Sequence, residues 1–333
     1  MACKTLWYGC QLLGSQINKR ASSDILDLCL DNNVLHFDLA ERYPFPEQKE
    51  TVGESEKIFG TWIKRKEREK IYIGTKVTGR NSEGWFGEDA ERLTYNRIRT
   101  AVQSSLKRLN TDYIDIFFLH WPDRFTNNFG RFYYEPESDP RFITFEEQFS
   151  ALVNAYEKGE IKAIGLANET PWGLMRFLEL NRTVGIKLYI QEPYSLLNRN
   201  VDIALKEIII REQLEFQAHS IFAGGLLTGK YKFENNDFAG VGRLSTFKHQ
   251  TRKLRQKDIF QRYKLAAEFC KENNVNLMEM AFAYVYSKKY IGNIILGAST
   301  IEQLQNIFGA YSRTHFLTNL TKDLEEKLYP TNV

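Results

Sequence analysis

The sequence has few cysteines, no long apolar run and almost no net charge, and each absence excludes a class of protein. The four cysteines lie singly at positions 3, 10, 29 and 270, without C-x-x-C spacing. No apolar run approaches the roughly 20 residues that a transmembrane helix needs. Lys and Arg number 45 against 42 Asp and Glu, so the formal charge of +3 favours neither nucleic acid nor an anionic membrane as a partner.

The start of the chain carries no cationic segment followed by an apolar one, so no secretory signal is expected. Together with the scattered cysteines, this predicts a cytoplasmic location. His249 and His315 have no partners at the spacing of metal ligands, and no metal site is expected. A chain of 333 residues with 43% hydrophobic side chains can bury one large core or two modest ones. Because no extended linker divides it, residues 1–333 are predicted to form a single domain.

Short runs rich in β-branched and aromatic residues alternate with longer segments of helical period, a pattern typical of βα units and a parallel sheet. We predict eight strands, near residues 5–9, 34–38, 71–77, 113–119, 161–167, 187–191, 214–219 and 292–296. The segments 22–33, 54–67, 95–110, 144–160 and 171–181 place apolar residues three and four apart, as outer helices do. Ser22 or Ser23, Thr94 and Thr170 are predicted N-caps.

Two parallel architectures fit this order of elements, an open doubly wound sheet and a closed barrel. The first strand is not followed by the G-x-G-x-x-G pattern of dinucleotide-binding open sheets. We therefore predict an α/β fold of the (β/α)₈ TIM barrel type. The stretches 78–93, 122–144 and 222–256 are longer than plain connections, which predicts long loops after strands 3, 4 and 7 at the C-terminal face.

Four polar residues, Asp38, Tyr43, Lys76 and His120, lie at or just beyond the ends of three successive predicted strands. The C-terminal ends of the strands are where a (β/α)₈ barrel presents its catalytic groups. Any one of these residues alone would most often be a cap, a surface charge or a core residue. Together they predict an active site. His36 is predicted to face the barrel interior one layer below Asp38.

Seven motifs in order extend this interpretation: FDLAERY, IYIGTKV, SLKRLNTDYIDIFFLHWPD, IGLANET, IQEPYSLLNR, GGLLTGKY and IILGASTIEQL. In this order they resemble the aldo-keto reductase superfamily over almost the whole chain, with the Tas-type bacterial reductases and the potassium-channel β subunits as the nearest branches. The resemblance implies a barrel that binds a nicotinamide dinucleotide, usually NADPH, and reduces a small-molecule aldehyde or ketone. Neither the substrate nor the oligomeric state follows from it.

The resemblance also implies roles for the four polar residues. Tyr43 is the expected general acid, and the ammonium of Lys76 is expected to stabilise its anion. Asp38 is expected to pair with Lys76 and keep it protonated. His120 is expected to donate a hydrogen bond to the carbonyl oxygen of the substrate.

Cofactor positions follow from the same motifs. Asn168 and Gln191 match the residues that hold the nicotinamide carboxamide. The segment around the pyrophosphate is matched by Ser220, by the backbone of 221–225 including Gly225, and by Lys230 and Arg243. Gly297, Ser299, Gln303 and Asn306 match the adenosine side, where a helix N-terminus favours phosphate.

Three departures from the family pattern bear on cofactor choice and activity. His219 stands where an aromatic residue usually stacks on the nicotinamide, and an imidazole offers less area. Ile307 stands where an Asn often contacts adenine. No Arg or Lys accompanies Ser299 at the 2′-phosphate position, so NAD stays an alternative to NADP. A redox-sensing or regulatory nicotinamide-binding protein with slow or no turnover is the alternative function.

Overall fold

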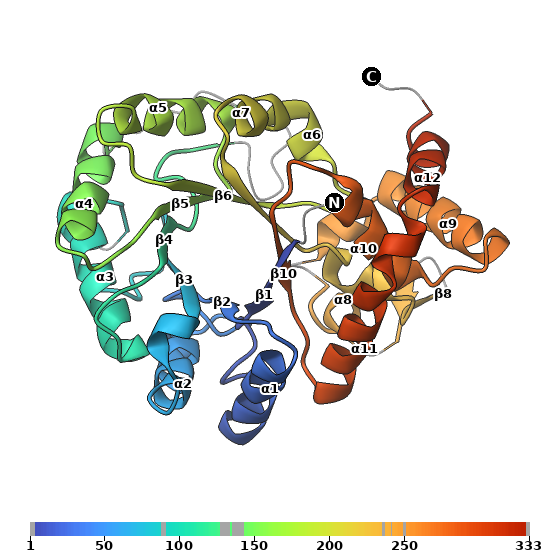
Figure 1. Cartoon of the computed structure of the whole chain (residues 1–333), viewed down its shortest axis with the longest axis horizontal. Coiled ribbons are helices and arrows are strands. Elements are labelled where there is room, and N and C mark those ends of the chain that lie inside the picture. Colours follow the sequence, from blue (N-terminus) through green and yellow to red (C-terminus); the bar gives the residue numbers. More distant parts are fainter. Residues whose placement is uncertain are drawn as a thin grey trace.

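A computed structural model gives the fold and describes residues 4–87, 91–126, 134, 143–234, 237–240, 242–248 and 251–330. Eight parallel strands close into a barrel in the order β1-β10-β7-β6-β5-β4-β3-β2, with the helices around it (Figure 1). The barrel strands are β1 Thr5–Gly9, β2 His36–Asp38, β3 Tyr72–Val77, β4 Ile116–Leu119, β5 Ile164–Ala167, β6 Leu188–Pro193, β7 Glu215–His219 and β10 Asn293–Leu296. The predicted (β/α)₈ barrel is confirmed, and each predicted strand overlaps one of these.

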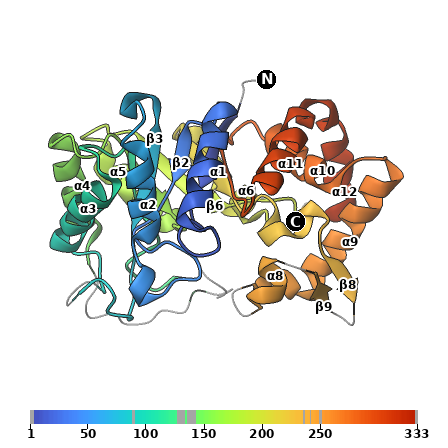
Figure 2. The same cartoon turned by 90° about the horizontal axis from the view of Figure 1, so that it is seen from below.

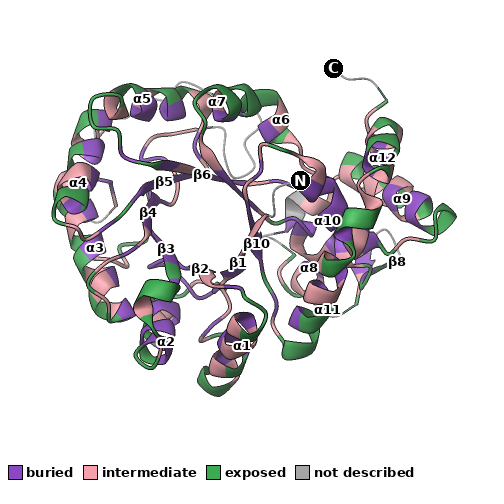
Figure 3. Cartoon of the chain, in the orientation of Figure 1, coloured by how far each residue is buried: buried purple, intermediate pink, exposed green. Residues whose placement is uncertain are grey.

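The helices of the described residues follow the strands in chain order. The α-helices are α1 Lys19–Asp31, α2 Glu54–Ile63, α3 Tyr95–Leu109, α4 Phe145–Glu157, α5 Pro171–Asn181, α6 Asn200–Ala204, α7 Lys206–Arg211, α8 Arg243–Thr246, α9 Lys257–Glu272, α10 Leu277–Ser287, α11 Ile301–Ser312 and α12 Leu320–Leu328. Short 3₁₀ turns are η1 Lys49–Thr51, η2 Arg68–Lys70, η3 Ala223–Thr228, η4 Arg252–Arg255 and η5 Thr314–Leu317. Most helices turn a buried face to the strands and an exposed face outward (Figure 3).

Of the three predicted helix N-caps, those of α3 and α5 are confirmed and that of α1 is wrong. The hydroxyls of Thr94 and Thr170 accept hydrogen bonds from the backbone N–H groups of Arg97 and Gly173, as caps of α3 and α5 do. The first helix starts earlier than predicted, because the side chain of Asn18 caps it by accepting from the N–H of Ala21. Ser22 and Ser23 lie inside α1 and are not its cap.

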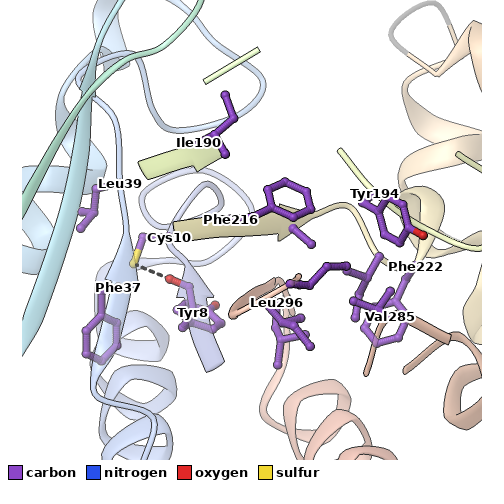
Figure 4. Close-up of a cluster of buried hydrophobic side chains, with 14 of the residues drawn as sticks. Tyr8, Cys10, Phe37, Leu39, Ile190, Tyr194, Phe216, Phe222, Val285 and Leu296 are labelled. Carbon is purple, nitrogen blue, oxygen red and sulfur yellow. Dashed lines mark hydrogen bonds between the residues drawn. The ribbon is translucent and has the colours of Figure 1, made fainter. Parts of the chain in front are cut away.

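The apolar core has two parts, one outside the barrel wall and one within it. The outer part lies between strands and helices and includes Tyr8, Phe37 and Phe216 of the strands and Val285 of α10 (Figure 4). The inner part fills the barrel and consists of Trp7, Ile116, Phe118, Ala163, Ala167 and Ile295. Phe118 fits there because β5 has no side chain at Gly165, where an added Cβ would lie 2.1 Å from the phenyl ring. This packing supports the barrel mouth from below.

The loop after β7 lies at the end of the barrel opposite the N-terminus, with α8 and a small hairpin (Figure 2). The hairpin pairs β8 Lys232–Glu234 with β9 Asp237–Ala239 and was not predicted. Of the predicted loop after β4, residues 127–133 and 135–142 lie outside the described residues, as does His249. Over the described part of the chain, every helix is too short or too polar to cross a membrane.

Candidate active site

The four predicted catalytic residues meet at the C-terminal end of the barrel. Asp38 is the last residue of β2, and Tyr43 follows it in the connection to α2. Lys76 is the penultimate residue of β3, and His120 directly follows β4. The phenol ring of Tyr43 lies edge-on to the imidazole of His120, with 5.8 Å between ring centroids. Sequence positions up to 82 residues apart thus share one site because parallel strands bring their ends to the same edge.

Lys76 and Asp38 form a buried ion pair. The ammonium of Lys76 lies 2.7 Å from Oδ1 of Asp38 and donates a second hydrogen bond of 2.7 Å to the carbonyl of Leu39. Lys76 is 0% exposed and Asp38 4%. Burial lowers the pKa of Lys76, and the charge and hydrogen bond of Asp38 oppose that shift. The predicted pairing of these two residues is therefore present in the structure.

Tyr43 is buried, with its ring centroid 5.3 Å from the ammonium of Lys76. Burial raises the pKa of Tyr43 well above its usual value, and the negative charges of Asp38 and Glu47 add to the shift. Arg243 opposes it. Burial is the largest effect on this pKa, and stabilisation of the phenolate by Lys76 stays a prediction. Tyr43 consequently holds its proton throughout the neutral pH range.

His120 is a neutral imidazole at the barrel mouth. Burial, Lys76 and Arg42 hold the pKa of His120 well below its usual range, in that order of importance. Its Nδ1 is buried and has no hydrogen-bond partner among the residues that the structure describes. A buried polar atom without a partner is costly, which points to a ligand contact at this atom or beside it.

The side-chain amides of Asn168 and Gln191 form hydrogen bonds to two of the predicted catalytic residues. The side chain of Asn168 donates a hydrogen bond of 2.9 Å to the backbone carbonyl of His120. Nε2 of Gln191 donates to Oδ1 of Asp38 and to Oε1 of Gln217, both at 2.9 Å. Sequence reasoning did not identify Gln217. Strand alternation could have found it, because it lies two residues before His219 on the same face of β7.

The segment after β7 brings several predicted cofactor residues close together. Nδ1 of His219 lies 2.9 Å from the hydroxyl of Ser220, whose backbone has a positive φ of 57°. Burial lowers the pKa of His219 to about 3. Lys230 lies between two glycines, since a Cβ added at Gly225 or Gly242 would come within 2.9 Å of its side chain. A side chain at either glycine would therefore displace this lysine.

Arg243 lies on the Tyr43 side of the barrel mouth. It begins α8, donates to the side-chain oxygen of Gln11 at 3.1 Å and covers the ring of Phe45 with 4.2 Å to the centroid. Burial lowers the pKa of Arg243, and Tyr43 and Glu47 oppose the shift. The guanidinium is therefore electrostatically coupled to the proposed acid.

The adenosine-side residues gather at the start of α11. Oε1 of Gln303 accepts from the backbone N–H and the hydroxyl of Ser299, both at 3.0 Å. A Cβ added at Gly297 would meet no atom within 4 Å, and Asn306 is exposed. Ile307, in contrast, is 4% exposed and packs in the core. Its side chain is turned inward from α11, and the expected loss of an adenine contact at this position stays a prediction.

At the rim, Trp85 and Trp121 were expected from the sequence to line the pocket or merely to cover it, whereas Arg42 and Glu83 were not identified as part of the site. Arg42, next to Tyr43, makes a bidentate contact with Glu83 at 2.8 and 3.1 Å. Its guanidinium lies over the ring of Trp85 at 4.6 Å and near that of Trp121 at 5.5 Å. These aromatic rings form a wall beside His120, whose ring centroid is 4.9 Å from that of Trp121.

Comparisons with known proteins agree with this arrangement. The sequence profile of the Aldo/keto reductase family matches residues 5–327. Protein tas of Escherichia coli (strain K12) is 33% identical over 306 residues, which cover 90% of this chain and 87% of that protein. L-glyceraldehyde 3-phosphate reductase of the same strain is 26% identical over 332 residues, covering 97% and 87%. A probable voltage-gated potassium channel subunit beta of Arabidopsis thaliana is 25% identical over 332 residues, covering 97% and 92%. These matches confirm the resemblance predicted from the motifs.

Proposed function

The chain belongs to the aldo/keto reductase family, and on that premise we propose that it reduces an aldehyde or ketone to an alcohol, with NADPH as cofactor and Tyr43 as the acid. The observation that carries the proposal is the buried pair of Lys76 and Asp38, 2.7 Å apart, beside a phenol that faces His120. A buried ammonium is costly unless it is paired, and Asp38 supplies the partner of Lys76.

The residues at the mouth fit a nicotinamide dinucleotide by their chemistry. Nδ1 of His120 is buried without a partner among the described residues, and Gly297 leaves open space beside the start of α11. The amides of Asn168 and Gln191 would hold the carboxamide, with His219 against the ring. The pyrophosphate would be held by Lys230, Arg243 and the backbone of 221–225 including Gly225, beside Ser220. The adenosine side would be held by Gly297, Ser299, Gln303 and Asn306.

When bound, a reduced nicotinamide supplies a hydride to the carbonyl carbon. Tyr43 then donates its proton to the substrate oxygen. Its raised pKa keeps the proton in place until needed, and an alkoxide is a much stronger base than a phenolate, so the transfer is favourable. The ammonium of Lys76, 5.3 Å from the phenol ring, stabilises the phenolate that results. His120, held neutral, orients the carbonyl by a hydrogen bond.

One observation favours a second function, a nicotinamide-binding sensor with slow turnover. The pKa of Tyr43 lies well above its usual value, which makes it a weaker acid than a phenol in water. The similarity to a potassium channel subunit beta agrees with a regulatory role. Both functions require cofactor binding, and they differ in the rate at which the bound cofactor is consumed. For either function we expect a cytoplasmic protein.

Fluorescence titration with NADPH and NADH, followed by oxidation of the bound cofactor with 4-nitrobenzaldehyde, tests the proposal. We expect micromolar binding and rapid oxidation. Lys230→Ala should weaken NADPH binding roughly tenfold, as loss of a charge-assisted contact does. Lys232→Ala, an exposed lysine two residues away on β8, is the matched control and should bind normally. Binding without oxidation would favour the sensor, and failure to bind either nucleotide would refute both functions.

A further inference from the structure

Gln217 is a buried polar side chain below the barrel mouth that the proposed chemistry does not use. It is 0% exposed and lies directly opposite Gln191 in the register of β6 and β7. Its Oε1 accepts a hydrogen bond of 2.9 Å from Nε2 of Gln191. Its own Nε2 is buried without a partner among the residues that the structure describes. An amide with one unpaired end is costly in a barrel interior, so packing alone does not explain it.

The two hydrogens of the Gln191 amide nitrogen are both in use. One points to Oδ1 of Asp38 at 2.9 Å, the atom that also receives the ammonium of Lys76. The other points to Oε1 of Gln217. A carboxylate paired with an ammonium can only accept, so the amide of Gln191 must turn its nitrogen toward Asp38. Gln191 can therefore contact a ligand only through its side-chain oxygen, which accepts a hydrogen bond.

Asp38 alone does not fix the direction of that oxygen. With a single hydrogen bond the amide plane can swing about the N···O axis, and the oxygen swings with it. A second bond from the same nitrogen to a second fixed acceptor defines the plane. Gln217 supplies that acceptor from the neighbouring strand, where its own backbone is held by the sheet.

We propose that Gln217 is a positioning residue that fixes the amide plane of Gln191, so that Gln191 presents only a hydrogen-bond acceptor and selects a nicotinamide ring whose substituent carries an N–H donor. The inference rests on the proposed function, because it assumes that a nicotinamide binds beside Gln191. It adds a residue and a selection rule to that function: the carboxamide is preferred to substituents that only accept.

The selection rule can be measured without turnover. The probes are NADPH and its 3-acetylpyridine analogue, in which an acetyl group without N–H replaces the carboxamide. We expect the native protein to bind NADPH roughly 3- to 10-fold more tightly than the analogue, the range of one hydrogen bond. Gln217→Met keeps the volume and removes the acceptor, and this ratio should fall toward one. Adenosine 2′,5′-bisphosphate, which lacks the nicotinamide, should bind both proteins equally.

Two further variants separate positioning from packing. Gln217→Glu, kept neutral by burial and by nearby Asp38, retains an oxygen at the same place and should restore most of the preference. Tyr189→Phe, a change one layer lower on β6, is the matched control and should leave the ratio unchanged. Circular dichroism should show Gln217→Met folded, with a thermal midpoint close to that of the native protein.

Each outcome has one meaning. If the native protein binds neither dinucleotide, the proposed function fails and the inference fails with it. If both dinucleotides bind but Gln217→Met leaves their ratio unchanged, the function stands and the positioning role is refuted. If Gln217→Met weakens NADPH, the analogue and the bisphosphate by the same factor, Gln217 supports the barrel only, and the inference is again refuted.

Discussion

The side-chain amide of Asn168 donates a hydrogen bond to the backbone carbonyl of His120 at 2.9 Å. Asn168 follows β5 and His120 follows β4, so the bond joins the ends of two neighbouring strands. Asn168 has a positive φ of 55°, a conformation that costs most side chains energy and that Asn and Gly tolerate best. One residue thereby links a proposed cofactor contact to a proposed catalytic group.

Asn168→Gly separates the role of the side-chain amide from the role of the positive φ. Glycine accepts the positive φ, so we expect a thermal midpoint near the native one, while NADPH binding weakens roughly 3- to 10-fold with the loss of the amide. Asn168→Ala loses the amide and also strains the backbone by about 1 kcal/mol. It should therefore unfold at a lower temperature than the glycine variant. Native cofactor affinity in Asn168→Gly would contradict the proposed role.

The pair of Lys76 and Asp38 should show strong coupling in a double-mutant cycle. Lys76→Met leaves a buried carboxylate without its cation, and Asp38→Asn leaves a buried ammonium without its anion. Each should lower the free energy of unfolding by about 3–5 kcal/mol. The double variant should lose clearly less than the sum of the two, because neither charge remains. Urea denaturation measures all four proteins, and strict additivity would show that the pair contributes nothing as a pair.

The cap of α1 offers a test of local stability far from the site. Asn18→Ala removes the hydrogen bond to the N–H of Ala21 and should destabilise the protein by about 1 kcal/mol. Ser23→Ala, inside the helix, is the matched control and should be nearly neutral. The reverse ranking in urea denaturation would favour the cap predicted from the sequence.

His36 should make stability depend on pH. Its ring stacks on that of Tyr72, with 4.4 Å between centroids, and burial lowers the pKa of His36 to about 4. The unfolded chain, with a pKa near 6.5, binds the proton more readily. The contribution is thus complete above about pH 6.5 and is lost as the pH falls toward about 4.

His36→Phe keeps a ring in the stack but binds no proton. Between pH 7 and 4.5 its free energy of unfolding should fall by roughly 1–3 kcal/mol less than that of the native protein. Urea denaturation at both pH values gives the comparison. Equal losses in the two proteins would mean that protonation of His36 does not oppose folding.

The barrel could be predicted from the sequence because its strands are short β-branched and aromatic runs separated by helical periodicity. Local signals also set the start of α3 and α5, where Thr94 and Thr170 precede clear apolar periods. The start of α1 was misplaced, because Asn18 precedes polar residues that hide the onset of the helix. The hairpin of β8 and β9 was missed because Lys232–Glu234 and Asp237–Ala239 are too short for a recognisable alternation.

The positions of the site residues could be predicted from motifs, but their burial and the directions of their side chains could not. Strand ends brought Asp38, Lys76 and His120 together as expected. The raised pKa of Tyr43 was not foreseen, because it depends on burial rather than on residue type. The burial of Ile307 was missed for a related reason: a motif fixes a position in the sequence, but helix packing decides which way the side chain faces.

The most direct test of the account is single-turnover oxidation of bound NADPH by 4-nitrobenzaldehyde in the native protein and in Tyr43→Phe. The variant keeps the ring that packs against His120 and loses only the hydroxyl. We predict that NADPH binding stays within about twofold, since the hydroxyl is not a binding contact, while oxidation slows by about 100-fold or more, as loss of a general acid does. Oxidation at the native rate in Tyr43→Phe would contradict the assignment of the acid.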